Sequence, residues 1–329
     1  MLLPLLLAAS AAVCAVQPAG AQIAATAAAA GAGTTVPGAP NCPMFPSDNV
    51  WNTPITRLPV DPHSAQWLLS MGSSTTLLHP DFGPSGDPAV AYGIPFVVVP
   101  PSHPTVRVRF EYADESNPGP YPFGSDVPIE GGNASGGDRH AIMVNPATCT
   151  LYELYDARYS PSGSTAGSGA IWHLRSNALR PGGWTSADAA GLPILPGLLD
   201  YGQVLSGRIT HAIRMTAALT DTRFIWPARH EAGARDDPSL PPMGARFRLK
   251  ASFDISRYSR HAQVVLRAMQ QYGLILADNG SNWYFQGAAD PRWPLALVDE
   301  LKTIPASAFQ AVNESSLMIS PNSGAARQR

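Results

Sequence analysis

The run Arg208-Ile-Thr-His-Ala-Ile-Arg-Met-Thr216 is followed, after a short turn, by Arg223-Phe-Ile-Trp-Pro-Ala-Arg-His230. Both runs are rich in β-branched and aromatic residues and change character with period two, which predicts two paired strands. Successive side chains on a strand point to opposite faces. We therefore expect two histidines and two arginines on this pair of neighbouring strands. They are His211, Arg214, Arg229 and His230.

Segments on both sides of these runs predict more strands and few helices. Strands are expected at 90–100, 105–112, 140–144, 150–156, 246–255 and 274–277. Short helices are expected at 64–71, 184–191, 196–205, 260–272 and 295–302. The turn Asn145-Pro-Ala-Thr148 is typical of a hairpin. Many short strands between Pro- and Gly-rich turns predict a mainly β fold, an antiparallel β-sandwich or jelly roll with a few short flanking helices.

The first 21 residues carry an apolar run and end in small residues, which predicts a cleaved signal peptide at 1–21. Residues 22–40 consist largely of Ala, Gly, Thr and Pro and are expected to form a disordered leader. A single β-rich domain should span 41–313, and the tail 314–329 should be loose. The charged content of 14% is low for a cytosolic protein, so we expect secretion, extracellular or periplasmic, with no later membrane span.

Two of the three cysteines, Cys42 and Cys149, remain once the signal peptide with Cys14 is removed. In an exported protein such an even pair predicts a disulfide. The 22 basic and 24 acidic residues form no basic stripe, so nucleic acid is not an expected partner. His140, His211 and His230 lack metal-ligand spacing, so no metal or other cofactor is expected.

Carboxyl groups near the ends of the predicted strands indicate glycoside hydrolysis, which needs one protonated and one ionised carboxyl group. Asp138 and Asp156 are expected to meet across the hairpin. The site should form where the segment of Asp138 and His140, the strands of His211 and His230, and the turn at Asp278 come together. The expected catalytic residues are Asp138, His140, Asp156, His211, His230 and Asp278. The expected substrate-binding residues are Glu130, Arg139, Arg214, Trp226, Arg229, Asn279 and Trp283.

Two other functions fit the same residues. A polysaccharide lyase would use Arg214 or Arg229 to neutralise a uronate, and His211 or His230 to accept a proton. A non-catalytic carbohydrate-binding or cell-surface protein would present an aromatic platform without paired carboxylates. Ordinary turn chemistry also accounts for the aspartates at 138 and 278.

Three runs resemble those of a group of exported bacterial proteins of unassigned function, some of them joined to carbohydrate-binding modules. The runs are Trp184-Thr-Ser-Ala-Asp-Ala-Ala-Gly-Leu-Pro-Ile-Leu-Pro-Gly-Leu198, Pro242-Met-Gly-Ala-Arg-Phe-Arg-Leu-Lys-Ala-Ser-Phe-Asp-Ile255 and Tyr272-Gly-Leu-Ile-Leu-Ala-Asp-Asn-Gly-Ser-Asn-Trp283. The resemblance covers nearly everything after Asn41. It implies work on a polysaccharide and identifies no catalytic residue.

Overall fold

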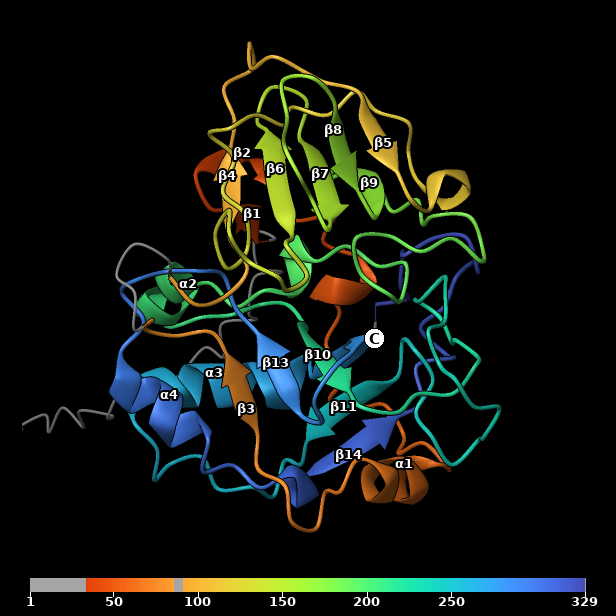
Figure 1. The fold of residues 1–329 in the computed structure, drawn as a ribbon. Coiled ribbons are helices and arrows are strands. Elements are labelled where there is room, and N and C mark those ends of the chain that lie inside the picture. The colour runs from red at the N-terminus through yellow and green to blue at the C-terminus, as the bar shows by residue number, and fades with distance from the viewer. Residues whose placement is uncertain (1–33, 86–90, 329) are drawn as a thin grey trace, which may run out of the picture. The chain divides into compact units, whose positions relative to one another are not determined.

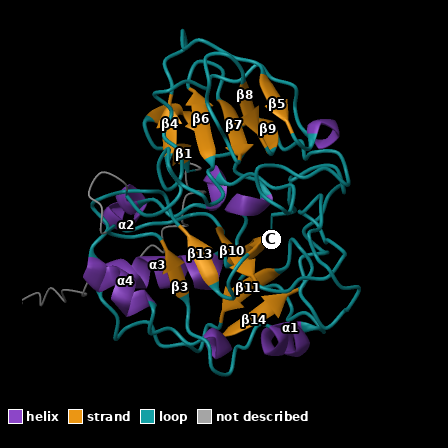
Figure 2. Ribbon diagram, in the orientation of Figure 1, coloured by secondary structure: helices purple, strands orange, loops and turns teal. Residues whose placement is uncertain are grey.

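The computed structural model describes residues 34–85 and 91–328, so the predicted signal peptide and the predicted leader up to residue 33 lie outside the described residues. The described chain is rich in short strands, with few short helices and long stretches of loop between them (Figure 2). The strands are β1 (Thr35–Val36), β2 (Ala39–Pro43), β3 (His79–Asp81), β4 (Phe96–Val98), β5 (Val108–Phe110), β6 (Ala141–Asn145), β7 (Thr150–Tyr155), β8 (Ser164–Ala166), β9 (Ser168–His173), β10 (Ile213–Ala217), β11 (Arg246–Leu249), β12 (Leu274–Asn279), β13 (Tyr284–Gln286) and β14 (Phe309–Val312). The α-helices are α1 (Ser64–Ser70), α2 (Tyr201–Ser206), α3 (Arg260–Gln271) and α4 (Leu295–Leu301).

The larger sheet has six strands in the order β14-β11-β12-β10-β13-β3 (Figure 1). Its central strand β12 begins Leu-Ile-Leu-Ala, and these four side chains are fully buried. A continuous apolar run of this kind is typical of a strand covered on both faces. Strand β10 pairs with β12 in parallel and with β13 antiparallel, so this is a mixed sheet. The crossover from β10 to β12 passes through α3, which packs against β11.

The predicted hairpin of 208–216 with 223–230 is wrong. Only Ile213–Ala217 forms a strand there, and its partners come from residues 274–286. Residues 223–230 form an isolated bridge from Phe224 to Met243, one turn and otherwise irregular backbone, fixed by hydrogen bonds such as those from Arg229 N and His230 N to Ala190 O. Pairing β10 with the apolar β12 buries more hydrocarbon than a polar local hairpin would, and burial is the dominant favourable contribution to folding.

The smaller sheet has the order β4-β6-β7-β9. The predicted hairpin in it is confirmed, because β6 and β7 pair antiparallel from Ala141↔Leu154 to Asn145↔Thr150. The edge strand β4 runs parallel to β6, and β5 pairs in parallel with β8 in a separate two-stranded sheet. The fold is therefore mainly β as expected, whereas its parallel pairs depart from the all-antiparallel arrangement that alternation suggested.

One hydrophobic core connects the two sheets. It contains Ile142 and Leu151 of the smaller sheet and Phe247 and Leu274 of the larger one. A second cluster, which includes Val108, Tyr121 and Met143, covers the other side of β6. Alternate residues of β6 therefore enter different cores, as the period of a strand requires.

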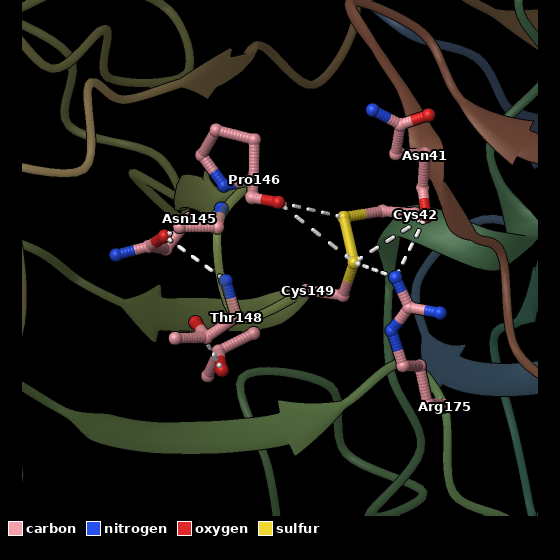
Figure 3. Close-up of a disulfide and its surroundings, with 9 residues drawn as sticks. Asn41, Cys42, Asn145, Pro146, Thr148, Cys149 and Arg175 are labelled. Carbon is pink, nitrogen blue, oxygen red and sulfur yellow. Dashed lines mark hydrogen bonds between the residues drawn. A yellow bond between two sulfur atoms is a disulfide. The ribbon is translucent and has the colours of Figure 1, made fainter.

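A disulfide joins Cys42 of β2 to Cys149, the residue before β7, across 107 positions of sequence (Figure 3). This confirms the predicted pairing. The guanidinium of Arg175 donates a hydrogen bond to the carbonyl oxygen of Asn41 at 2.9 Å and lies 3.3 Å from the Cys149 sulfur (Figure 3). The disulfide ties the hairpin of β1 and β2 to the smaller sheet.

Three other expectations need correction. Residues 184–191 form turns and bends instead of a helix. Within the predicted leader, Thr35–Val36 and Ala39–Pro43 pair as strands, so the ordered fold begins before Asn41. The tail after residue 313 is also packed, because Val50 N donates to Gly324 O and Glu314 pairs with the buried Arg246. Local composition does not reveal the partners that hold such polar segments.

Candidate functional site

Glu130 and His140 form a close ion pair beside β6. The Nδ1 atom of His140 lies 2.6 Å from Oε2 of Glu130, and its Nε2 atom lies 3.1 Å from the carbonyl oxygen of Ala187. Burial opposes a charge on His140, but the carboxylate of Glu130 raises the pKa of this histidine to about 9. Burial would likewise raise the pKa of Glu130, and His140 reverses this and holds it below the usual value. Glu130 is therefore an ionised carboxylate backed by a buried imidazolium.

Asp188, Arg214 and Asp278 form a second cluster in which two carboxyl groups share one cation. The Nε and Nη2 atoms of Arg214 donate to both oxygens of Asp188, at 3.0 and 2.7 Å, and Nη2 also lies 3.1 Å from Oδ2 of Asp278. The Asp188 side chain is wholly buried, whereas 21% of the Asp278 side chain is exposed. Burial and then the charge of Asp188 raise the pKa of Asp278 to about 7, against the pull of Arg214.

A pocket of about 390 Å³ is lined by three carboxylates and one phenol, Asp81, Glu130, Asp138 and Tyr92. The hydroxyl of Tyr92 donates to Asp81, and burial followed by this bond raises the pKa of Tyr92, so it stays protonated. Asp138 is exposed, and its carboxylate has no hydrogen-bond or ion-pair partner in the described part of the chain. The pocket thus presents an open carboxylate, Asp138, beside one with a fixed charge, Glu130.

The two clusters act on each other electrostatically. The charges of His140 and Asp138 both influence the pKa of Asp278, and the charge of Arg214 influences that of Glu130. The charge of Asp138 also raises the pKa of His140. These groups therefore form one charged assembly, which we call the carboxylate cluster. It consists of Glu130, Asp138, His140, Asp188, Arg214 and Asp278.

Three segments were predicted to line one pocket, but of their expected catalytic residues only Asp138 lines the acidic pocket, and His140 and Asp278 lie outside its lining. His211 is buried elsewhere, with Nε2 2.9 Å from Gln203 Oε1 and Nδ1 2.7 Å from Ala212 O. Its pKa is lowered to about 4 by burial, so it is a neutral structural histidine. His230 bonds to the carbonyl oxygen of Ala189 and lies 3.7 Å from Glu115. Neither histidine lines the acidic pocket, because the strand pair that was to carry them does not form.

The hairpin does bring Asp156 back to Asp138, through a 2.8 Å hydrogen bond from Asp156 N to Asp138 O. The Asp156 carboxylate, however, pairs with the exposed Arg158 at 2.7 Å. Arg139 turns into the loop before it and donates to the carbonyl oxygens of Asn133, Ser135 and Ala157. The contacts of Asp156 and Arg139 are therefore made within the protein, which gives both residues a structural role.

The other predicted binding residues lie outside the acidic pocket. Arg229 donates to the carbonyl oxygens of Arg180 and Pro321. Asn279 accepts from Thr220 and donates to Ala232 O. Trp283 is fully buried, and its indole nitrogen donates to Met71 O at 3.0 Å.

Trp226 lines a different, larger cavity. Large aromatic residues after a strand are more often core or loop anchors than ligand platforms, which explains these differences.

Asp188, Asp81 and Tyr92 are site residues that the sequence did not single out. Asp188 lies in the run Ser-Ala-Asp-Ala-Ala-Gly, where it is the one charged side chain among small residues. A single carboxylate among small residues is the signal that could have identified Asp188, because a buried charge requires a partner. Asp81 and Tyr92 carry no comparable signal.

No group of three or more His, Cys, Asp or Glu side chains within the described ranges is arranged to hold a metal ion. Across residues 34–85 and 91–328, no helix has the length and apolar character needed to cross a bilayer. In comparisons with known proteins, no protein-family model, curated protein or solved structure matches the chain.

Proposed function

We propose that the protein is a secreted glycoside hydrolase in which Asp278 is the general acid and Glu130 the ionised base or nucleophile. The supporting observation is that two carboxyl groups of one cluster have opposite surroundings. Glu130 is paired with a buried cation of its own, whereas Asp278 shares a cation with the better-bonded Asp188. In enzymes, a general acid and a general base are typically two titratable groups whose surroundings move their pKa values apart.

In this mechanism Asp278 donates its proton to the glycosidic oxygen as the bond to the sugar breaks. Glu130 either activates a water molecule or attacks the anomeric carbon directly. His140 keeps Glu130 charged and oriented, since both of its ring nitrogens are held by hydrogen bonds. Arg214, itself fixed by Asp188, holds Asp278 in place, and Asp138 offers an open acceptor for substrate hydroxyl groups.

The contacts of the arginines favour hydrolysis over a lyase reaction. A lyase needs a cation free to neutralise a uronate, but Arg214 is bound by two carboxylates and Arg229 by carbonyl oxygens and an amide. His211, the proposed proton acceptor, is buried, with one ring nitrogen against Ala212 O and the other against the side-chain amide of Gln203. Among the described residues that line the acidic pocket, moreover, there is no arginine, lysine or histidine.

A screen of neutral, amino and uronic-acid polysaccharides tests this proposal. We expect new reducing ends without the ultraviolet absorbance that elimination produces. Glu130→Gln and Asp278→Asn should each lower kcat by roughly 100-fold or more. Glu111→Gln and Asp299→Asn, which alter exposed carboxylates outside the cluster, are matched controls and should retain activity.

An ultraviolet-absorbing product would instead establish a lyase. Full activity of both cluster variants would remove the assigned roles. Binding of a glycan without cleavage would favour a carbohydrate-binding protein.

A further inference from the structure

A second cavity, of about 540 Å³, shares none of its described lining residues with the acidic pocket. Its walls come from three parts of the chain, near residues 61–67, 221–242 and 313–321. The volume is in the range of roughly 300–1,000 Å³ that small-molecule sites occupy. Its lining combines aromatic rings with charged and amide side chains, so it is amphipathic.

Hydrogen bonds hold the walls of this cavity in place. The indole nitrogen of Trp67 donates to Pro238 O at 3.1 Å, and that of Trp226 donates to Ser323 O at 2.9 Å. The backbone of Ile225 donates to Met243 O at 2.9 Å. The cavity is therefore formed before any ligand arrives, which reduces the entropy cost of binding.

Apolar surface is exposed at the mouth of the cavity. Phe224 and Ile225 are each 37% exposed and both line the cavity. The exposed ring of His63 stacks on Trp67, with centroids 5.6 Å apart, and both residues line the cavity. Adjacent exposed apolar side chains of this size mark binding surfaces.

Two polar side chains that line the cavity with these rings have hydrogen-bond donors available to a ligand. Arg223 is fixed by Asp221 through Nε and Nη2, which leaves its Nη1 atom without a hydrogen-bond partner among the described residues. The side-chain oxygen of Asn313 accepts from Ser315 N, while its amide nitrogen donates to no group in the described chain. A wholly apolar ligand would leave these donors unsatisfied, at a cost in affinity.

We propose that this cavity is a second carbohydrate site, which holds one or two pyranose rings of a polysaccharide. A pyranose ring has a face of C–H groups that packs on Phe224 and Ile225 and an edge of hydroxyl groups that accepts from Arg223 and Asn313. This combination of apolar faces and a few placed polar groups is what ligand sites of this kind offer. The site is independent of whether the carboxylate cluster hydrolyses anything.

Isothermal titration calorimetry with xylohexaose, cellohexaose, maltohexaose and a glucosamine hexamer tests the proposal. We expect at least one oligosaccharide to bind, and Phe224→Ala to raise its Kd tenfold or more. Arg223→Gln should raise it several-fold, which gives a second test if the phenylalanine variant folds poorly. Leu219→Ala, at a residue that is 44% exposed and lies outside the cavity lining, is the control and should bind normally.

Glu130→Gln separates this site from the acidic pocket and should leave the binding unchanged. Binding lost in Glu130→Gln but kept in Phe224→Ala would overturn the second site and leave the proposed hydrolase standing. Failure of all four oligosaccharides to bind would overturn it too, as would an anilinonaphthalene dye that occupies the cavity and is displaced by none of them.

Discussion

His211 and His140 are both buried, and their surroundings fix opposite charges. His211 meets a carbonyl and an amide, and burial lowers its pKa to about 4. His140 meets a carboxylate, and its pKa rises to about 9 despite burial. The nature of the nearest partner therefore decides the charge, since burial is common to both.

The lowered pKa of His211 makes stability depend on pH. The unfolded chain takes up this proton near pH 6.5 and the folded chain only near pH 4, so the contribution is present above about 6.5 and is lost as the pH falls towards about 4. Its size is at most about 3.5 kcal/mol, from about 1.4 kcal/mol per pKa unit. His211→Gln removes this contribution, so the slope of its unfolding free energy against pH, measured by urea titration, should be less positive than that of the wild type in this window.

His173→Gln is the control for that experiment, since this histidine is exposed on β9 and should leave the slope unchanged. His140 affects stability between about pH 6.5 and 9, and Asp278, whose pKa is raised to about 7, acts with the opposite sign to His211 in the window of this experiment; both are present in wild type and variant, so the difference between the two slopes reports His211. An unaltered slope in His211→Gln would contradict the buried neutral histidine.

At the scale of elements, α3 begins at Arg260, where the sequence predicts its start, and Ser259 caps it. The Ser259 side chain accepts a hydrogen bond from Ala262 N. Ser259→Ala should lower the unfolding free energy by about 1 kcal/mol, because a backbone donor of the first turn loses its partner. Ser259→Asn keeps an acceptor and should retain most of the stability in the same urea titration. Equal losses in both variants would show that the cap contributes nothing.

The disulfide joins two elements that are far apart in sequence. Because the closed segment spans 107 positions, replacing both Cys42 and Cys149 with serine should lower the unfolding free energy by about 2–5 kcal/mol. Thermal unfolding with and without a reductant measures this effect. The double variant should unfold at the same temperature in both conditions, and the oxidised wild type at a higher one. If reductant does not lower the unfolding temperature of the wild type, the prediction is contradicted.

Elements held by local contacts could be predicted from the sequence, and elements held by distant ones could not. The β6–β7 hairpin has its turn and both strands within fifteen positions, so the alternation located it. Strand β10 pairs instead with residues about 60 positions later, in parallel, and no turn signal marks such a pairing. The segment 184–191 contains good helix formers, yet its backbone bonds to Arg229 and Ala277 instead.

The same limit applies to the candidate site. Glu130, Asp138, His140, Arg214 and Asp278 were all singled out from the sequence as candidates, and the structure places them in one charged cluster. The grouping depends on Asp188, which the sequence left unremarked and which fixes Arg214 from another loop. His211 and His230 were included only because a hairpin was expected there.

Across the whole molecule, the C-terminal segment is fixed by a buried ion pair. Arg246 is fully buried and donates to Glu314 at 2.8 Å and to the carbonyl oxygens of Val50 and Thr53. Glu314→Ala would leave this cation without its counter-charge, so it should cost about 3–5 kcal/mol of unfolding free energy. Glu111→Ala, at an exposed position, is the control and should change it by less than about 0.5 kcal/mol. A loss below about 1 kcal/mol for Glu314→Ala would mean that the tail is not held this way.

The central claim is that one cluster keeps one carboxyl group protonated and another ionised. Nuclear magnetic resonance titration of carbon-13-labelled side-chain carboxyl groups tests it without a substrate, with signals assigned from Asp278→Asn and Glu130→Gln. The account predicts that Asp278 titrates near pH 7, while Glu130 titrates below its usual value. If both groups titrate together near the ordinary carboxyl range of about 4, no acid and base pair exists and the account is contradicted.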